Sequence, residues 1–174
     1  KACFAMDTRE SSPALLNAAM TGCQSVGVAT TDFGLCTTPQ LHWLVSQNLT
    51  DPKNWDLYPQ HFKTKFVDFV TLCAENSMTK SKENYQSQLL LDCANGVGAH
   101  VMRKMIALQG FQEHLQITLF NDDEQPTNLN NQCGAEHLKN KQLPTGWDKS
   151  KHAGLKCVSF DGDADRQIYF YGDE

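Results

Sequence analysis

Two short apolar segments, each followed by a proline-marked helix start, constrain the fold of this chain more than any other feature. Residues 2–6 predict a strand, and a serine–proline pair at residues 12–13 then opens a helix, with the serine as its cap. Residues 26–30 predict the next strand, and a threonine–proline pair at residues 38–39 repeats the helix start. This order of strand, helix, strand and helix favours a largely parallel sheet of the α/β class.

A change in composition predicts a domain boundary in the first half of the chain. Asn, Asp, Pro, Lys and Tyr dominate residues 48–60, and we expect residues 51–60 to form a linker. Residues 1–50 then belong to one α/β domain and residues 61–174 to a second. Because the chain starts with Lys and reads as a strand from its second residue, we expect a piece of a longer protein with two incomplete α/β domains and mixed, largely parallel sheets.

The second domain continues the alternation of helices and strands. A helix is predicted over residues 61–75 from apolar residues at helical spacing, and residues 76–88 are polar and predict a loop. The elements expected after them are a strand at 89–91, a turn at 92–98, a helix at 99–108, a strand at 115–120, a short helix within 133–141, and strands at 157–160 and 167–171.

Composition excludes several classes of protein. The net charge is −5, and no basic stripe that could neutralise nucleic-acid phosphates is present. No run of 18 apolar residues predicts a membrane span, and nothing resembles a signal peptide, so we expect a cytoplasmic protein. The seven cysteines form no CxxC pair and predict buried free thiols in a reducing compartment. The sequence indicates no oligomeric state.

An acidic loop late in the chain is the most informative stretch for chemistry. Asp161, Asp163 and Asp165 alternate with a glycine and an alanine. Carboxylates this close repel one another unless a cation lies between them, and Mg²⁺ prefers oxygen ligands in near-octahedral geometry. The pattern therefore predicts that the three aspartates bind one Mg²⁺ and leave positions open for a phosphate oxygen or water. Arg166 follows with a planar guanidinium group suited to phosphate.

Other interpretations of this loop remain open at the level of the residues. It could be a solvated acidic turn, or a non-catalytic site for Mg²⁺ or Ca²⁺. An EF-hand starting at Asp161 would need Gly where Arg166 stands, Glu where Gly172 stands, and a preceding helix instead of a strand. A haloacid-dehalogenase-type phosphatase would use Asp161 as nucleophile, but its motif needs Thr or a similar residue where Asp165 stands.

Two weaker signals lie at other turns. Residues 95–98 (Asn-Gly-Val-Gly) connect a strand to a helix, as a phosphate-binding loop would, but the third glycine of a dinucleotide fingerprint would fall at Val101. A tight turn that needs positive φ is the favoured interpretation. Arg9 lies between a strand and a helix start, where it could meet an anionic ligand or simply face solvent.

Several of these segments resemble one family. Residues 161–166 (Asp-Gly-Asp-Ala-Asp-Arg) resemble the metal-binding loop of the α-D-phosphohexomutases. Residues 7–12 (Asp-Thr-Arg-x-Ser-Ser) and 37–39 (Thr-Thr-Pro) resemble motifs of their first domain, and residues 92–98 resemble the opening of their second domain. The resemblance covers nearly the whole chain in the correct order. It is most similar to the branch of the family that acts on N-acetylglucosamine phosphates, at residues 34–42, 119–122 and 159–166.

The resemblance implies a phosphosugar substrate and a known type of reaction. The parent would be a four-domain enzyme that interconverts N-acetylglucosamine 6-phosphate and 1-phosphate on the route to UDP-N-acetylglucosamine. A phosphoserine would donate its phosphoryl group to the sugar, and a bisphosphate intermediate would return the other one. The metal would neutralise charge on the transferred group. Arg9 and Arg166 would then be candidate phosphate contacts.

The resemblance also implies that essential parts lie outside the chain. In bacterial members the phosphoserine loop follows the Thr-Pro motif, but nothing like it lies between Pro39 and Leu89. In the N-acetylglucosamine branch that loop precedes the Asp-Thr-Arg motif, so the phosphoserine is expected upstream of Lys1. Ser11 and Ser12 are interpreted as loop and capping residues. We therefore predict no catalytic nucleophile within these residues and no mutase activity of the chain alone.

Overall fold

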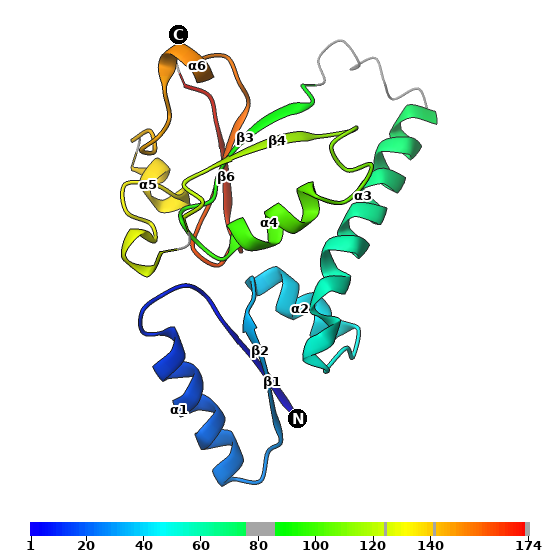
Figure 1. The fold of residues 1–174 in the computed structure, drawn as a ribbon, viewed down its shortest axis with the longest axis vertical. Coiled ribbons are helices and arrows are strands. Elements are labelled where there is room, and N and C mark those ends of the chain that lie inside the picture. The colour runs from blue at the N-terminus through cyan, green and yellow to red at the C-terminus, as the bar shows by residue number, and fades with distance from the viewer. Residues whose placement is uncertain (76–85, 124, 141, 173–174) are drawn as a thin grey trace.

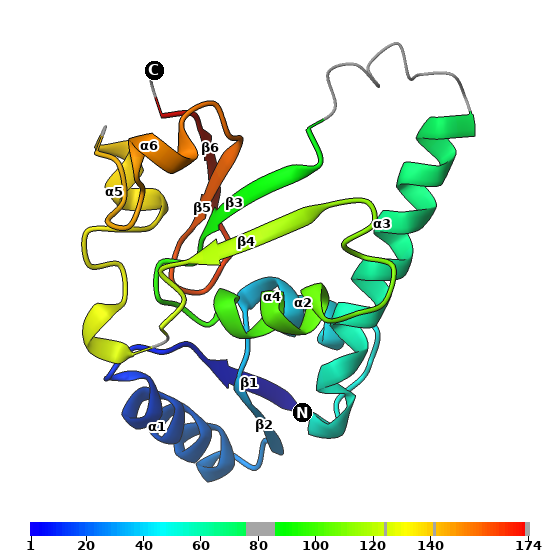
Figure 2. The same ribbon diagram turned by 45° about the horizontal axis from the view of Figure 1, so that its top comes forward.

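The computed structural model describes residues 1–75, 86–123, 125–140 and 142–172, which form two α/β units in contact with each other (Figure 1). The first unit contains a two-stranded sheet in which β1 and β2 run parallel. Figure 2 shows α1 and α2 on either side of these strands. The elements of this unit are β1 (Ala2–Met6), α1 (Ser12–Ser25), β2 (Thr30–Leu35) and α2 (Thr38–Ser46).

The second unit is built on a four-stranded sheet with the order β4-β3-β5-β6. Strand β3 runs parallel to β4 and to β5, and β6 runs antiparallel to β5, so the sheet is mixed and mostly parallel as predicted. Its elements are η1 (Pro52–Asp56), α3 (Leu57–Glu75), β3 (Gln88–Asp92), α4 (Gly98–Ile106), β4 (Gln116–Phe120), η2 (Pro126–Asn128), α5 (Ala135–Lys139), α6 (Lys149–His152), β5 (Cys157–Phe160) and β6 (Gln167–Phe170).

The main core lies between this sheet and the helices α3 and α4. Leu91 of β3, Ile117 of β4 and Val158 of β5 are buried in one cluster with Phe111, which follows α4. Phe66 of α3 packs against Phe111 with ring centroids 5.4 Å apart. Strand β3, with Leu90 and Leu91 buried side by side, has the continuous apolar character of a strand that is covered on both faces.

The first unit has a smaller core on the α2 side. Phe33 of β2 and Leu44 of α2 are buried together, whereas α1 contributes no buried residue. The buried side chain of Gln40 donates a hydrogen bond of 3.0 Å to the carbonyl oxygen of Trp55 in η1. The ammonium group of Lys104 in α4 lies 4.0 Å from the centroid of the Trp55 ring. Trp55 thus connects α2 to the second unit.

Two local predictions in the first unit were wrong. The strand predicted for residues 26–30 starts only at Thr30, because Val26 and Gly27 still donate backbone hydrogen bonds to the last turn of α1. Gly27 also has a φ of 78°, which turns the chain out of the helix. Ser12 does not cap α1: the N-cap is Ser11, and the Ser12 hydroxyl donates to Asp7 at 2.5 Å.

The other segments follow the sequence with small shifts. Residues 51–60, where a linker was expected, form η1 and the start of α3, and the Asp51 side chain caps η1. Helix α6 was not predicted. Of the loop predicted over residues 76–88, residues 76–85 lie outside the described part, and Gln88 already begins β3.

The cysteines follow the prediction of buried free thiols in part, since Cys3, Cys23 and Cys73 are only half-buried. All seven cysteines are free, and Cys36, Cys93, Cys133 and Cys157 are buried. Among the helices that the structure describes, none has the length and apolar character needed to cross a membrane.

Candidate metal centre

The three parallel strands of the second unit end at the same edge of the sheet. Asp92 pairs with Phe120 at the end of β3 and β4, and with Ser159 near the end of β5. The loops that follow these strands therefore emerge side by side. In open α/β sheets the carboxyl ends of the strands are the usual place for a ligand.

The acidic loop follows β5 at this edge. Asp161, Asp163 and Asp165 each offer a carboxylate oxygen, and these oxygens all lie within 4.8 Å of one another. Asp161 is buried, Asp163 is half-buried and Asp165 is exposed. A strand, not a helix, precedes the loop, which is incompatible with an EF-hand.

Asp161 is held from within its own loop. The carboxylate accepts hydrogen bonds from the Nε of Arg166 at 2.7 Å and from the backbone N–H of Arg166 at 3.2 Å. The Nη1 of Arg166 also lies 3.3 Å from Glu136 of α5. Arg166 thus folds back over the loop, and its positive charge supports the buried carboxylate of Asp161.

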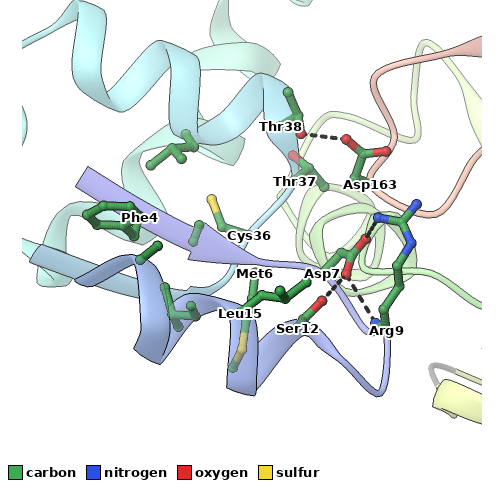
Figure 3. A pocket seen from close by; sticks show the side chains of 14 residues that line it. Phe4, Met6, Asp7, Arg9, Ser12, Leu15, Cys36, Thr37, Thr38 and Asp163 are labelled. Carbon is green, nitrogen blue, oxygen red and sulfur yellow. Dashed lines mark hydrogen bonds and ion pairs between the residues drawn. The ribbon is translucent and has the colours of Figure 1, made fainter. Parts of the chain in front are cut away.

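Asp163 is held from the first unit. The hydroxyl of Thr38, the first residue of α2, donates to Asp163 Oδ2 at 2.5 Å, and the backbone N–H of Thr38 donates to the Asp163 carbonyl oxygen at 3.1 Å. Figure 3 shows the two side chains facing each other across the boundary between the units. The sequence analysis treated Thr38 as part of a helix start and missed this contact.

Asp165 has the weakest support of the three. Its carboxylate forms an ion pair of 3.7 Å with the Nε of Arg166. Partial desolvation raises the pKa of Asp165, and the charge of Asp163 and a side-chain hydrogen bond with Asp161 raise it further. The loop therefore concentrates negative charge that its protein neighbours do not fully balance, and a bound cation would balance it.

The turn after β3 packs directly against the backbone of the acidic loop. The backbone N–H of Val97 donates to the carbonyl oxygen of Gly162 at 3.1 Å. A Cβ atom on Gly96 would lie 2.4 Å from that same oxygen. The positive φ predicted for this turn occurs at Ala94 (54°) and Asn95 (53°) and not at the glycines. Gly96 is therefore required because the two loops approach closely, and not because of its φ.

A buried aspartate that the sequence analysis did not single out connects the loops. The carboxylate of Asp92 is fully buried and accepts four hydrogen bonds. These come from the Ser159 hydroxyl (2.6 Å), the Gly134 N–H (2.7 Å), the Ala94 N–H (3.0 Å) and the Asn121 side-chain amide (3.0 Å). Because the donors come from four segments, Asp92 fixes the ends of β3, β4 and β5 and the start of α5 relative to one another.

A cavity of 340 Å³ lies between the first unit and the acidic loop. Asp7, Arg9, Thr38 and Asp163 are among its polar lining residues, and side chains of β1, α1 and the start of α2 line most of the rest (Figure 3). Arg9 forms an ion pair with Asp7 and stays half-exposed. The structure thus brings Arg9 to the same cavity as one of the three aspartates.

Arg166 lines a different cavity. This space of 390 Å³ is bounded by α5 and the loop before it, and Asp161 and Glu136 also line it. The two arginines that the sequence suggested as phosphate contacts therefore lie on different sides of the acidic loop.

The residues present fit a hard divalent cation. The donor set consists of carboxylate oxygens, which Mg²⁺ prefers, and three protein ligands leave positions for water or a phosphate oxygen. Desolvation raises the pKa of Asp165 most, and such a cation would relieve the repulsion from Asp163 that raises this pKa further.

Comparison with known proteins decides the family. The profile described as "Phosphoacetylglucosamine mutase AMG1, domain II" matches residues 55–168, which is more than half of the chain. The chain belongs to this phosphoacetylglucosamine mutase family. Residues 1–51 match the profile described as "Phosphoglucomutase/phosphomannomutase, alpha/beta/alpha domain I". Family membership confirms the resemblance seen in the sequence and decides against a haloacid-dehalogenase-type phosphatase.

Curated phosphoacetylglucosamine mutases are similar to the chain along nearly its whole length. The protein of Mus musculus is 38% identical over 174 residues, a match that covers 98% of this chain and 30% of the mouse protein. The protein of Candida albicans is 38% identical over 176 residues and is covered to the same extent. The chain thus spans about a third of the length of these relatives.

Solved structures of phosphoacetylglucosamine mutases share the fold. An N-acetylglucosamine-phosphate mutase in a substrate complex has a TM-score of 0.79 and 35% identity, with coverage of 99% of this chain and 31% of that one. The enzyme of Aspergillus fumigatus, solved in complex with GlcNAc-6P and magnesium, has a TM-score of 0.75 and 30% identity, with coverage of 99% and 34%.

Proposed function

We propose that this chain forms part of a phosphoacetylglucosamine mutase that interconverts N-acetylglucosamine 6-phosphate and N-acetylglucosamine 1-phosphate. The observation that carries the proposal is the group of three carboxylates at the carboxyl edge of a parallel sheet, in a member of this family. The proposed domains are residues 1–50 and 61–174 with a boundary at residues 51–60, and the two profile matches support them.

The proposed cofactor is one Mg²⁺ ion held by Asp161, Asp163 and Asp165. When bound, this ion would neutralise charge on the phosphoryl group in transfer. The magnesium in the complex of the Aspergillus fumigatus enzyme supports this choice of metal. The residues of this chain would hold the ion, with Arg166 supporting the ligand Asp161, and would leave a position open to a phosphate oxygen.

The phosphoryl-donating serine is proposed to lie upstream of Lys1, and Arg9 and Arg166 are proposed phosphate contacts. Ser12 is not proposed as the donor, and its hydroxyl donates to the carboxylate of Asp7 at the start of α1. The activity is therefore assigned to the whole protein. A cytoplasmic location is also proposed, and the seven free cysteines support it.

The proposal is tested by following phosphorus-31 signals of the intact protein with N-acetylglucosamine 6-phosphate and MgCl₂. We expect the 1-phosphate signal to appear, and to be lost when EDTA removes the metal. Asp163→Asn should slow the reaction at least about a hundredfold. Asp68→Asn, the same substitution on the exposed side of α3, serves as the control and should leave the rate unchanged.

Two outcomes would contradict this assignment. The metal site is wrong if Asp163→Asn retains the wild-type rate. The assignment of the activity to the whole protein is wrong if the purified 174-residue chain isomerises the sugar phosphate by itself.

A further inference from the structure

The contact between Thr38 and Asp163 is the most informative feature that the proposed function does not use. It joins residues 125 positions apart and connects α2 of the first unit to the acidic loop of the second. Among the hydrogen bonds that the structure describes for the acidic loop, the two donated by the first unit both come from Thr38.

The N-terminus of α2 is arranged so that Thr38 can make this contact. Thr37 is the N-cap, and its side chain accepts the N–H of Gln40. Pro39 has no N–H, and the N–H of Leu41 donates to the Thr37 carbonyl oxygen at 3.0 Å. Of the N–H groups in this first turn, that of Thr38 donates to the Asp163 carbonyl oxygen. The helix start therefore satisfies its own backbone groups and uses one of them to dock the acidic loop.

The hydroxyl of Thr38 adds a constraint on the Asp163 side chain. It donates to Oδ2 at 2.5 Å, which fixes the rotation of the carboxylate and leaves Oδ1 without that donor. This contact orients the Asp163 carboxylate before a cation arrives.

We infer that Thr38 is a positioning residue for the metal site: its hydroxyl orients Asp163 for the cation and couples metal binding to the docking of the first unit on the second. The inference rests on the proposed Mg²⁺ site. Partners of metal-bound carboxylates act in this way in other proteins, where their loss weakens metal binding by about 10–100-fold.

The coupling has a reciprocal consequence. If docking of α2 orients Asp163 and so strengthens metal binding, then bound metal must strengthen the docking of α2 by the same factor. The first turn of α2 should therefore open less often when the metal is bound, and its amide hydrogens should exchange more slowly.

The test compares Thr38→Val with wild type in the intact protein, by titration calorimetry with MgCl₂ in metal-free buffer. Valine keeps the branched shape and the backbone N–H but lacks the hydroxyl. We expect about tenfold weaker binding of Mg²⁺, and a melting temperature in EDTA that falls by no more than the loss of this one hydrogen bond would cause. Thr38→Ser restores the hydroxyl and should bring the dissociation constant back near the wild-type value.

Thr64→Val is the matched control. Thr64 lies on α3, is exposed, and its hydroxyl donates to the Gln60 carbonyl oxygen of its own helix at 3.0 Å. The same substitution there should leave Mg²⁺ binding unchanged. Hydrogen exchange adds a second measurement: Mg²⁺ should slow exchange of the α2 first-turn amides in wild type and in Thr64→Val, and less so in Thr38→Val.

The outcomes separate this inference from the proposed metal site. If wild type binds Mg²⁺ and Thr38→Val binds it equally well, the inference is wrong and the metal site stands. A loss of affinity that serine does not rescue also overturns the inference, because it would then reflect general disruption. If wild type binds no Mg²⁺, the metal site and this inference both fail.

Discussion

The close approach of Gly96 to Gly162 allows the support of the metal loop to be tested with a single methyl group. In Gly96→Ala the new Cβ would lie 2.4 Å from the Gly162 carbonyl oxygen and 2.9 Å from its carbonyl carbon and Cα. All three atoms belong to the backbone, so no side chain can rotate away. Since real Cβ atoms stay at least 3.0 Å from such neighbours, the two loops must separate by at least 0.6 Å.

The magnitude follows from two contributions. Overpacking against a rigid neighbour costs about 1–3 kcal/mol. The hydrogen bond from the Val97 N–H to the Gly162 oxygen must also lengthen, which costs about 1 kcal/mol. We therefore expect a loss of about 2–4 kcal/mol, which lowers the melting temperature by roughly 4–16 °C for a unit of this size. Because Gly162 lies between two of the proposed ligands, Mg²⁺ should also bind more weakly.

The assay is a thermal melt of the intact protein with and without MgCl₂, and Gly22→Ala is its control. Gly22 lies in α1, where a Cβ would meet nothing within 4 Å. There the same change should leave the melting temperature equal or raise it, because alanine is favoured over glycine within helices by about 1 kcal/mol. The reasoning is refuted if Gly96→Ala melts at the temperature of Gly22→Ala and binds Mg²⁺ like wild type.

Three further predictions concern the rest of the chain. Asp92→Asn replaces one of the two acceptor oxygens by an NH₂ group, which cannot accept hydrogen bonds from the donors that face it. Urea denaturation should show that the free energy of unfolding falls by about 2–3 kcal/mol. Burial raises the pKa of Cys36 and of Cys133 from 9.0 to about 12. Because these thiols lose their protons at lower pH in the unfolded chain than in the folded one, the melting temperature should fall as the pH rises from about 9 toward 12. Lys104→Met removes the cation from above the Trp55 ring and should cost about 0.5–1 kcal/mol in the same urea assay, with no change in Mg²⁺ binding.

Local chemistry in the sequence was sufficient to predict most elements. Strand β3 was predicted because three leucines precede a polar turn, and β5 because a short apolar run precedes the acidic loop. The error at residues 26–30 has a physical cause, since apolar Val26 is used to end α1 and is 75% exposed. Sequence pattern alone does not distinguish an apolar residue in a strand from one that completes a helix end.

The candidate site was only partly visible in the sequence. Asp161, Asp163 and Asp165 were chosen because carboxylates spaced by one small residue must lie close together in any fold. Thr38 and Asp92 could not be chosen in this way, because their partners are 125 and 67 positions away along the chain. A polar residue at the end of a buried strand, such as Asp92, is the one signal that could have drawn attention to this network.

The three aspartates have different protein partners, and this difference makes a final prediction about their individual roles. Asp161 is buried and accepts two hydrogen bonds from Arg166, and Asp163 accepts one from Thr38. Asp165 is exposed; partial desolvation raises its pKa, and repulsion by the charge of Asp163 raises it further. In EDTA, Asp161→Asn should therefore lower the melting temperature, because the neutral amide cannot form the ion pair that the Asp161 carboxylate forms with Arg166.

Asp165→Asn should have the opposite effect in EDTA. It removes a carboxylate that repels Asp163, so the melting temperature should rise slightly above that of wild type. With Mg²⁺ the order should reverse: wild type gains about 2.7 kcal/mol when the ion is at a hundred times its dissociation constant, while Asp165→Asn, lacking one ligand, gains much less. If Asp165→Asn lowers the melting temperature in EDTA, the repulsion is not the dominant interaction of that carboxylate. A reversal on adding Mg²⁺ would indicate that the loop gives up stability in the metal-free state in exchange for binding the ion.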